Sequence, residues 1–522
     1  MILHKKSILK KTIQVGSSTL LSRVFGLLRD ILLSRYLGTG AISDSFLTAY
    51  KIPNFLRKIF AEGALSAAFI PTLVNVMRSE GKKQASSLIS LGFIIFEGFL
   101  ILWCSFVMLT AKWWISVIAP GFSAEQIQYT VPYLQILMPF ILFISSSALL
   151  AGALQTVGHF FVPAFAPVLL NIVFIIALFV CMHFNLAVEW LCGFIIFGGL
   201  LQFLCHLYMY FKLHFNFNEI TQTTKKHFII IFYKFLPCLI TLSIAEISIF
   251  ISTSLASYLP SGSISLMNYA FGFLRIPLGV FAIAFSTILL PHFSRITSYA
   301  PKRLSYYLLE TSKFVFWITI PSTILMIFFS EKIFYTTFLS SKFTIAQVYE
   351  SASILTMFLF GLFFFSFNKI LLNMYYALHV TWIPTIISLI ATTLNVALDL
   401  ILMKYFNATG LAIATTISIG MVQTVLLVTF LFVRFKFRSY IKNFGEFVFR
   451  YSIQMACIMI PTYFVYRLLE FWIAKLPSWL SQFMLNGLGF WIWVGPLCLL
   501  IAAALFYLRK LFKVKLYFLE LS

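Results

Sequence analysis

The sequence predicts an all-α polytopic membrane protein with fourteen transmembrane helices. We expect two parallel six-helix repeats that form two lobes around a central cavity, and two extra helices at the C-terminus. The chain of 522 residues is 61% hydrophobic and only 10% charged, whereas soluble proteins carry about 25% charged residues. Apolar stretches of about 20 residues, the length that crosses a bilayer, recur along the chain. Short motifs also recur at a nearly constant spacing.

The apolar stretches give the expected helices. Their limits are 15–37, 42–77, 85–110, 127–157, 160–182, 186–211, 228–258, 264–292, 305–330, 346–377, 381–404, 409–433, 446–469 and 486–508. The second, fourth, eighth and tenth are long enough to bend or protrude. We expect Pro53 to break the second, because a proline inside a helix removes a backbone hydrogen bond.

Positive charge gives the orientation, because cytoplasmic loops of membrane proteins are rich in Lys and Arg. With the N-terminus inside, 22 basic residues fall in the inside segments and six in the outside loops. The inside segments are 1–16, 78–85, 211–234, 295–303, 434–442 and 509–522. Topology therefore explains the net charge of +22 without a nucleic-acid partner. We expect a multi-pass protein of the bacterial inner membrane with both termini in the cytoplasm.

An internal duplication defines the expected domains. The motif YLGTGAIS at 36–43 resembles YLPSGSIS at 258–265, an offset of 222 residues. Ile52-Pro53 matches Ile276-Pro277 at an offset of 224. A six-helix period keeps the orientation of each helix, so the repeats are parallel, and rocking of one lobe against the other would give alternating access. We expect an N-terminal lobe at 1–225, a C-terminal lobe at 226–440, and helices thirteen and fourteen with a basic tail at 441–522.

The stretch from Ser22 to Pro71 holds more charge than any other predicted membrane segment. Its charged residues are Arg23, Arg29, Asp30, Arg35, Asp44, Lys51, Arg57, Lys58 and Glu62. A charge at the bilayer centre costs about 3 kcal/mol or more, so such residues normally face a cavity or a partner. Six basic residues against three acids leave a surplus of positive charge. That surplus predicts an anionic ligand.

Three motifs of this stretch carry a family resemblance. They are SRVFGLLRD at 22–30, TAYKIPNFLR at 48–57 and FAEGALSAAFIP at 60–71. With the repeat and the topology, the chain resembles the MurJ (MviN) family of lipid II flippases, a branch of the multidrug/oligosaccharidyl-lipid/polysaccharide exporter superfamily. The resemblance implies transfer of the undecaprenyl-pyrophosphate-linked peptidoglycan precursor, lipid II, to the outer leaflet. It also implies contacts with membrane lipids and with cell-wall synthesis proteins.

The resemblance places substrate-binding residues at Arg23, Arg29, Asp44 and Arg57. A further family arginine falls here at Gly272, and we expect Arg275, one turn away, to supply that charge. Arginine suits a pyrophosphate because its guanidinium binds two oxygens at once and stays charged when buried. We expect structural or gating roles for Asp30, Lys51, Pro53 and Glu62. The alternative is that these charges only pair between helices or reach the membrane surface.

A second polar group predicts cation coupling. Asn395 and Asp399 lie four residues apart on one face of helix eleven, and Thr415 lies on the next helix. Such oxygens in an apolar setting suit Na⁺ or a proton relay, and no other cofactor is expected. Pairing of Asp399 with Lys404 is the alternative.

Other functions remain open at this stage. A cation-coupled multidrug exporter would need an acidic cavity, and a flippase could carry another polyprenyl-linked oligosaccharide. A third alternative is a scaffold for cell-wall synthases. We do not expect an enzyme, because the short loops hold no HExxH, GxSxG or P-loop motif. Helices thirteen and fourteen either receive the lipid tail, as the resemblance implies, or pack peripherally.

Overall fold

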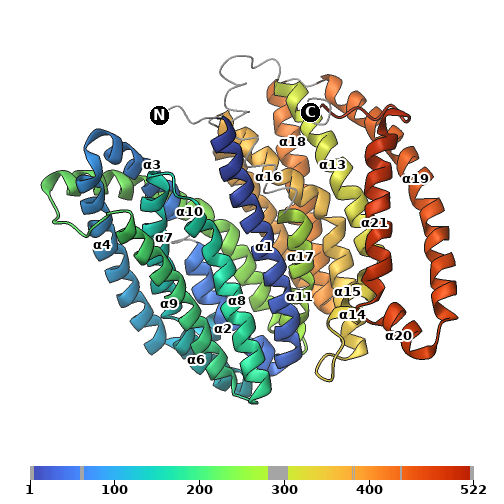
Figure 1. The fold of residues 1–522 in the computed structure, drawn as a ribbon, viewed down its shortest axis with the longest axis horizontal. Coiled ribbons are helices and arrows are strands. Elements are labelled where there is room, and N and C mark those ends of the chain that lie inside the picture. Colours follow the sequence, from blue (N-terminus) through green and yellow to red (C-terminus); the bar gives the residue numbers. More distant parts are fainter. Residues whose placement is uncertain are drawn as a thin grey trace. The chain divides into compact units, whose positions relative to one another are not determined.

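The computed structural model describes residues 5–58, 64–279, 304–378, 380, 382–435 and 438–517. These residues are mostly helical (Figure 1). Their contacts divide the chain into two compact units, Met1–Ser265 and Leu266–Ser522. α10 packs against α3 and α4 of the first unit, although it follows the lobe boundary expected at 225/226. The expected domain limits stay a prediction.

The first unit is a bundle in which α1 lies along α8 and α2 lies along α6. Its helices are α1 (Lys5–Leu37), α2 (Ala41–Arg57), α3 (Ala64–Ser79), α4 (Gly81–Leu109), α5 (Ala111–Ile118), α6 (Ala124–Leu137), α7 (Phe140–Thr156), α8 (Phe161–His183), α9 (Val188–Lys212) and α10 (Gln222–Ala256). α11 (Ser263–Pro277) begins in this unit and continues into the next.

In the second unit, α13 packs against α16 and α19, and α19 packs against α21. Its helices are α13 (Leu304–Phe328), α14 (Ser330–Thr337), α15 (Ile345–Phe360), α16 (Leu362–Ala377), α17 (Trp382–Thr415), the π-helix η4 (Thr416–Val422), α18 (Gln423–Phe435), α19 (Arg438–Ala474), α20 (Ser478–Asn486), α21 (Phe490–Tyr507) and the 3-10 turn η5 (Leu508–Lys510).

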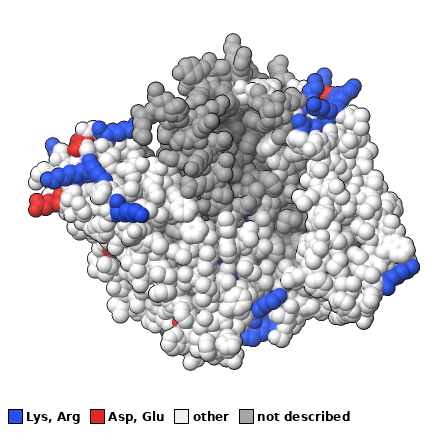
Figure 2. Space-filling view, in the orientation of Figure 1, with Lys and Arg blue, Asp and Glu red and all other residues white. Residues whose placement is uncertain are grey.

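The helices identify a multi-pass membrane protein. Among the described residues, eight helices are long and apolar enough to cross a bilayer, or nine if the bent pair α15–α16 is one span. The expected total of fourteen stays a prediction. Large apolar side chains lie on the outside, such as Leu102 at 73% and Leu109 at 86% exposure, a surface that suits lipid rather than water. Figure 2 shows charged side chains near helix ends and an almost uncharged band between them.

The predicted bend in the tenth helix is confirmed, and a bend in the fourth stays a prediction. The fourth is interrupted at Met138 and Pro139 between α6 and α7. The tenth bends by 42° at Gly361, where a Cβ atom would lie 2.5 Å from the Phe365 ring. Pro139 at the first interruption and Gly361 at the bend lie 222 residues apart.

Backbone features repeat at the same spacing as the sequence motifs. Asn185, between α8 and α9, and Asn407, inside α17, both have a φ of 49° and lie 222 residues apart. Asn407 divides α17 between the predicted eleventh and twelfth helices. Capping boxes open α6 at Ser123 and α15 at Thr344, an offset of 221. These pairs support the duplication, because each marks the same connection in both halves.

The predicted break at Pro53 is wrong, because α2 continues through this buried proline for one more turn, to Arg57. A membrane helix tolerates a proline where neighbouring groups satisfy the freed backbone carbonyl. Glu62 and the second half of the expected eighth helix, from residue 280 on, lie outside the described residues.

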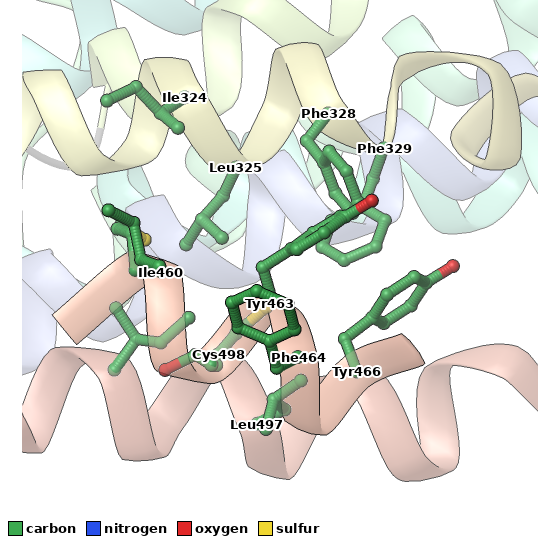
Figure 3. A pocket seen from close by; sticks show the side chains of 13 residues that line it. Ile324, Leu325, Phe328, Phe329, Ile460, Tyr463, Phe464, Tyr466, Leu497 and Cys498 are labelled. Atoms are coloured by element: carbon green, nitrogen blue, oxygen red, sulfur yellow. The ribbon is translucent and has the colours of Figure 1, made fainter. Parts of the chain in front are cut away.

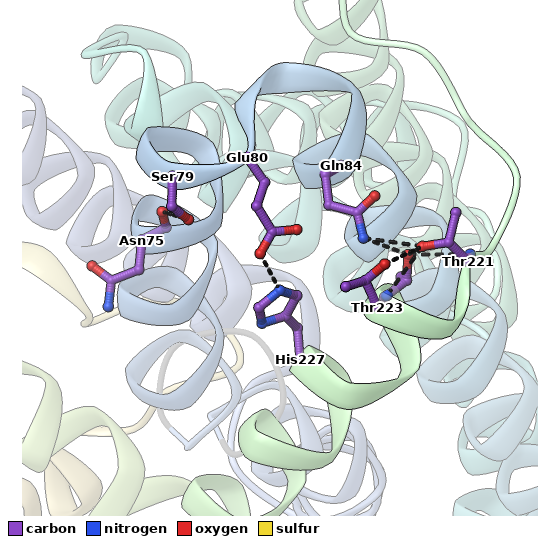
Figure 4. A network of polar contacts seen from close by, with 8 residues as sticks. Asn75, Ser79, Glu80, Gln84, Thr221, Thr223 and His227 are labelled. Carbon is purple, nitrogen blue, oxygen red and sulfur yellow. Dashed lines mark hydrogen bonds and ion pairs between the residues drawn. The ribbon is translucent and has the colours of Figure 1, made fainter.

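The connection between α9 and α10 is tied to the start of α4 (Figure 4). His227 Nε2 and Glu80 Oε1 lie 2.6 Å apart, and Gln84 donates to the hydroxyls of Thr221 and Thr224, both at 3.1 Å. Lys82 Nζ donates to the Leu213 carbonyl. These contacts fix the end of the first unit at which the predicted cytoplasmic charges lie.

Candidate functional site

Arg29 is the best-defined of the predicted substrate-binding residues. Its Nε and Nη2 donate to Asp30 Oδ1 at 3.0 and 2.8 Å, and its Nη1 donates to Asn171 Oδ1 at 3.1 Å. Its guanidinium carbon lies 5.3 Å from the centre of the Phe174 ring. The neighbouring carboxylate and α8 thus hold the guanidinium in one place. Three of the five N–H donors of an arginine are used in these bonds.

Asn171 is a residue of this site that the sequence reasoning missed. Its Nδ2 donates to the Ser22 carbonyl at 3.1 Å, so its carboxamide joins α8 to α1 while its oxygen accepts from Arg29. The available signal was an amide side chain in an otherwise apolar helix.

The other predicted cations of the first unit lie along α1 and α2. Arg23 is partly buried and Arg35 is exposed. Lys51 Nζ donates to Thr253 Oγ1 at 2.8 Å and thereby links α2 to α10. Arg57 Nε donates to Asn54 Oδ1 at 2.7 Å, and Arg57 also lines a cavity inside the unit.

Asp44 is held by backbone amides at the start of α11. It is 2% exposed, and its two oxygens accept from Gly262 N at 2.7 Å and Ser265 N at 2.8 Å. The Ser265 hydroxyl also donates to Asp44. A carboxylate in this position satisfies free N–H groups and the positive end of a helix dipole. These contacts give Asp44 a structural role, because they anchor the start of α2 to the start of α11. A direct contact of Asp44 with substrate stays a prediction.

The anchor brings the two repeats into contact. Ser43 and Ser265 occupy the same place in the duplicated motif, and their hydroxyl oxygens lie 2.8 Å apart. A Cβ atom on Gly262 would come within 3.5 Å of the backbone of Thr39 and Gly40, so the two motifs pack closely. We call Ser43, Asp44, Gly262 and Ser265 the Asp44 clamp.

Arg275 lies on α11 in the second unit. It is exposed, and its guanidinium carbon lies 4.8 Å from the centre of the Phe271 ring. The idea that Arg275 replaces the charge missing at Gly272 stays a prediction.

Two residues of the predicted cation site, Asn395 and Thr415, are in contact in the second unit, and the site itself stays a prediction. Asn395 and Asp399 are buried on α17, and Asn395 Nδ2 donates to Thr415 Oγ1 at 3.5 Å. Thr415 immediately precedes the π-helix η4. π-Helical turns occur frequently at functional sites.

A large apolar groove lies on the second unit between α13, α19 and α21 (Figure 3). Its volume is about 330 Å³. Its walls are formed almost entirely by apolar and aromatic side chains, among them Ile324, Phe328, Ile460, Tyr463 and Leu497. It therefore suits an aliphatic chain rather than a polar head group.

The fold and these sites define a polytopic transporter of the multidrug/oligosaccharidyl-lipid/polysaccharide exporter type. A solved "Lipid II flippase MurJ, inward closed conformation" matches with a TM-score of 0.76 and 27% identity, over 96% of this chain and 99% of that chain. An inward-facing multidrug transporter of the MATE family matches with a TM-score of 0.69 at 14% identity, over 83% of this chain and 99% of that chain. This second likeness shows the fold alone.

Sequence relatives agree with the first structure. The "Probable lipid II flippase MurJ" of Buchnera aphidicola subsp. Schizaphis graminum is 31% identical over 492 residues, 91% of each chain. The "Lipid II flippase MurJ" of Burkholderia cenocepacia is 32% identical over 379 residues, 71% of this chain and 73% of that one. The family model "Lipid II flippase MurJ" matches residues 33–486. The chain belongs to the MurJ family of lipid II flippases.

Proposed function

We propose that this protein is a flippase that carries lipid II from the inner to the outer leaflet of the bacterial inner membrane. Family membership supports the substrate. The observation that carries the proposal is that two of the three acids in the stretch from Ser22 to Pro71 are bound within the protein. Asp30 accepts from Arg29 and Asp44 from backbone amides. The stretch carries six basic residues against three acids, and this surplus of positive charge supports an anionic substrate.

Arg29 is the residue best prepared to hold a pyrophosphate. Asp30 and Asn171 fix its guanidinium, so little side-chain freedom is lost when an anion binds. The remaining N–H donors can bind phosphate oxygens in the paired geometry that arginine favours. Arg23 and Arg57 add positive charge along the same two helices. The lipid tail would stay in an apolar environment, because each buried CH₂ group contributes about 0.8 kcal/mol.

The groove of α13, α19 and α21 is the proposed path for that tail. Its apolar lining and volume of about 330 Å³ suit part of a polyprenyl chain. The predicted alternative, peripheral packing of the two C-terminal helices, would not need an open groove on their surface.

Transport by alternating access requires the Asp44 clamp to open and close. The clamp is a discrete set of hydrogen bonds between equivalent motifs of the two repeats. Such a set can switch between bonded and open states, as a gate must. We propose that Na⁺ or a proton at Asn395, Asp399 and Thr415 supplies the energy, because Asn395 and Asp399 are buried on one helix and Asn395 donates to Thr415.

The remaining features follow from transport. The protein acts without bond-making chemistry of its own, and both termini lie in the cytoplasm, as the basic segments indicate. Its partners are lipid II, the surrounding membrane lipids and proteins of cell-wall synthesis. A multidrug exporter is disfavoured because cationic drugs need an acidic cavity, and the first two helices here carry surplus positive charge.

Replacement of the flippase in a reporter bacterium tests the proposal. The native flippase is depleted, this protein is expressed, and lipid II in the outer leaflet is measured. We expect restored outer-leaflet lipid II with the wild-type protein, and loss of this rescue with Arg29→Ala. Correct insertion without rescue by the wild-type protein would refute the substrate assignment.

A further inference from the structure

A polar cavity lies inside the first unit, and neither Arg29 nor a residue of the Asp44 clamp is among its lining residues. It has a volume of about 320 Å³ and is lined by residues of α2, α3, α7, α8 and α9. Its polar side chains are Arg57, Ser147, Gln155, Gln202 and His206. We call it the Gln202–His206 cavity. Its size falls within the range of small-ligand sites in proteins.

Two of these polar side chains are deeply buried yet have hydrogen-bonding capacity to spare. Gln202 is 8% exposed and His206 is 2% exposed. Within the described residues, the Gln202 carboxamide makes no hydrogen bond, and its Oε1 is buried without a partner. His206 Nδ1 lies 2.9 Å from the Gln202 carbonyl. Because a carbonyl only accepts, Nδ1 carries the proton, which leaves Nε2 as an acceptor in the neutral ring.

Leaving buried polar groups unbonded costs about 1–3 kcal/mol each, so such groups in a native protein call for a partner. Packing does not explain them, because an apolar side chain at position 202 or 206 would fill the same helix face without that cost. Water can bond to them when the cavity is empty, and a volume of about 320 Å³ also admits a larger ligand group. These side chains therefore indicate a binding site for a polar group of a ligand.

The residues that line the cavity indicate which chemical group of a ligand would bind there. The Gln202 carboxamide can donate and accept at once, which is the pattern that pairs with a secondary amide. The lining also includes the small or rigid apolar residues Ala148, Ala151, Pro163 and Pro167, which suit a methyl substituent. Arg57, at the end of α2, places one positive charge beside these groups.

We infer that the Gln202–His206 cavity binds an acylamino group of the substrate head group, with Arg57 holding a neighbouring anionic group. This inference rests on the proposed function, since it adds a head-group subsite to the same transport cycle. Two parts of the substrate contain such a group: an N-acetylated amino sugar and the peptide amides. The shared chemistry is a secondary amide with a small apolar substituent.

The test measures lipid binding to the full-length protein in nanodiscs by native mass spectrometry. Three probes are used: polyprenyl pyrophosphate alone, the same lipid with the N-acetylated disaccharide but no peptide, and lipid II. The main variant is Gln202→Met, which keeps the size of the side chain and removes both hydrogen-bonding groups. Ala151→Leu fills the cavity without touching Gln202 and serves as the second variant should the first fold poorly.

Gln454→Met is the matched control. Gln454 is also buried, at 0% exposure, and its Oε1 is likewise without a partner in the described part of the chain. It lies on α19 in the second unit and does not line the Gln202–His206 cavity. A general effect of removing a buried carboxamide would appear in both variants.

We expect Gln202→Met to weaken lipid II binding about three- to tenfold, the effect of one or two lost neutral hydrogen bonds. Binding of polyprenyl pyrophosphate should not change. A loss that already appears with the disaccharide lipid assigns the cavity to the amino sugar, and one seen only with lipid II assigns it to the peptide. Equal binding of all probes by wild-type and both cavity variants, or equal weakening for every probe, overturns the inference. Failure of the wild-type protein to bind lipid II would instead refute the proposed function.

Discussion

Asp44→Asn should open the contact between the two repeat motifs. The carboxylate accepts from Gly262 N, Ser265 N and the Ser265 hydroxyl. An asparagine keeps one acceptor oxygen but turns an NH₂ group towards a backbone N–H. Loss of a hydrogen bond to a charged group costs about 1.5–3 kcal/mol, and loss of the charge at a helix N-terminus adds about 0.3–1 kcal/mol. A total of about 2–4 kcal/mol shifts the closed-to-open ratio by about 30- to 900-fold.

The shift can be measured by disulfide formation between Ser43→Cys and Ser265→Cys, whose native hydroxyls lie 2.8 Å apart. Membranes that contain the pair, with and without Asp44→Asn, are oxidised and the cross-linked fraction is followed over time. We expect Asp44→Asn to slow cross-linking strongly. Glu97→Gln, which neutralises another buried acid, should leave it unchanged. Equal cross-linking with and without Asp44→Asn, or an equal effect of both substitutions, would refute the clamp.

Three further substitutions test the remaining parts of the account. Arg29→Ala should weaken binding of polyprenyl pyrophosphate about tenfold or more, because charge-assisted hydrogen bonds are lost. Arg35→Ala, at an exposed position of α1, should leave this binding unchanged. Equal effects of the two substitutions in a binding assay would contradict the role of Arg29. Asp399→Asn should abolish the Na⁺- or proton-dependent part of transport in proteoliposomes, and an unchanged gradient dependence would exclude this site. Ile460→Trp should fill the apolar groove and weaken binding of long-chain lipids more than binding of short-chain lipids. Val465→Trp, on the same helix but outside the groove lining, should leave the binding of both unchanged. The same loss of binding for both chain lengths would count against a tail path.

The fold was largely predictable because its main determinants are local. Apolar stretches of the right length marked the helices, and the repeated motif marked the duplication. Helix length indicated a bend in the tenth helix, which lies at Gly361. Pro53 misled us, because this proline inside α2 leaves the helix intact. Whether a proline breaks a membrane helix depends on neighbours that satisfy the freed carbonyl, and a single sequence does not show those neighbours.

The candidate site was predictable in its charges but not in its contacts. The charge surplus identified the stretch with Arg29, yet its partner Asn171 lies 142 residues away. The repeat aligned Ser43 with Ser265, but it did not show that Asp44 would bind the backbone beside that serine. Gln202 and His206 were missed because two polar residues four apart on an apolar helix are common. Only the packing of five helices shows that they share a cavity.

The most direct test of the central claim is the amount of lipid II in the outer leaflet of a flippase-depleted bacterium that expresses this protein. We predict that the wild-type chain restores outer-leaflet lipid II, and that Arg29→Ala, inserted at the same level, does not. Full restoration by Arg29→Ala would contradict the claim that the arginines of the first helices hold the pyrophosphate during transfer.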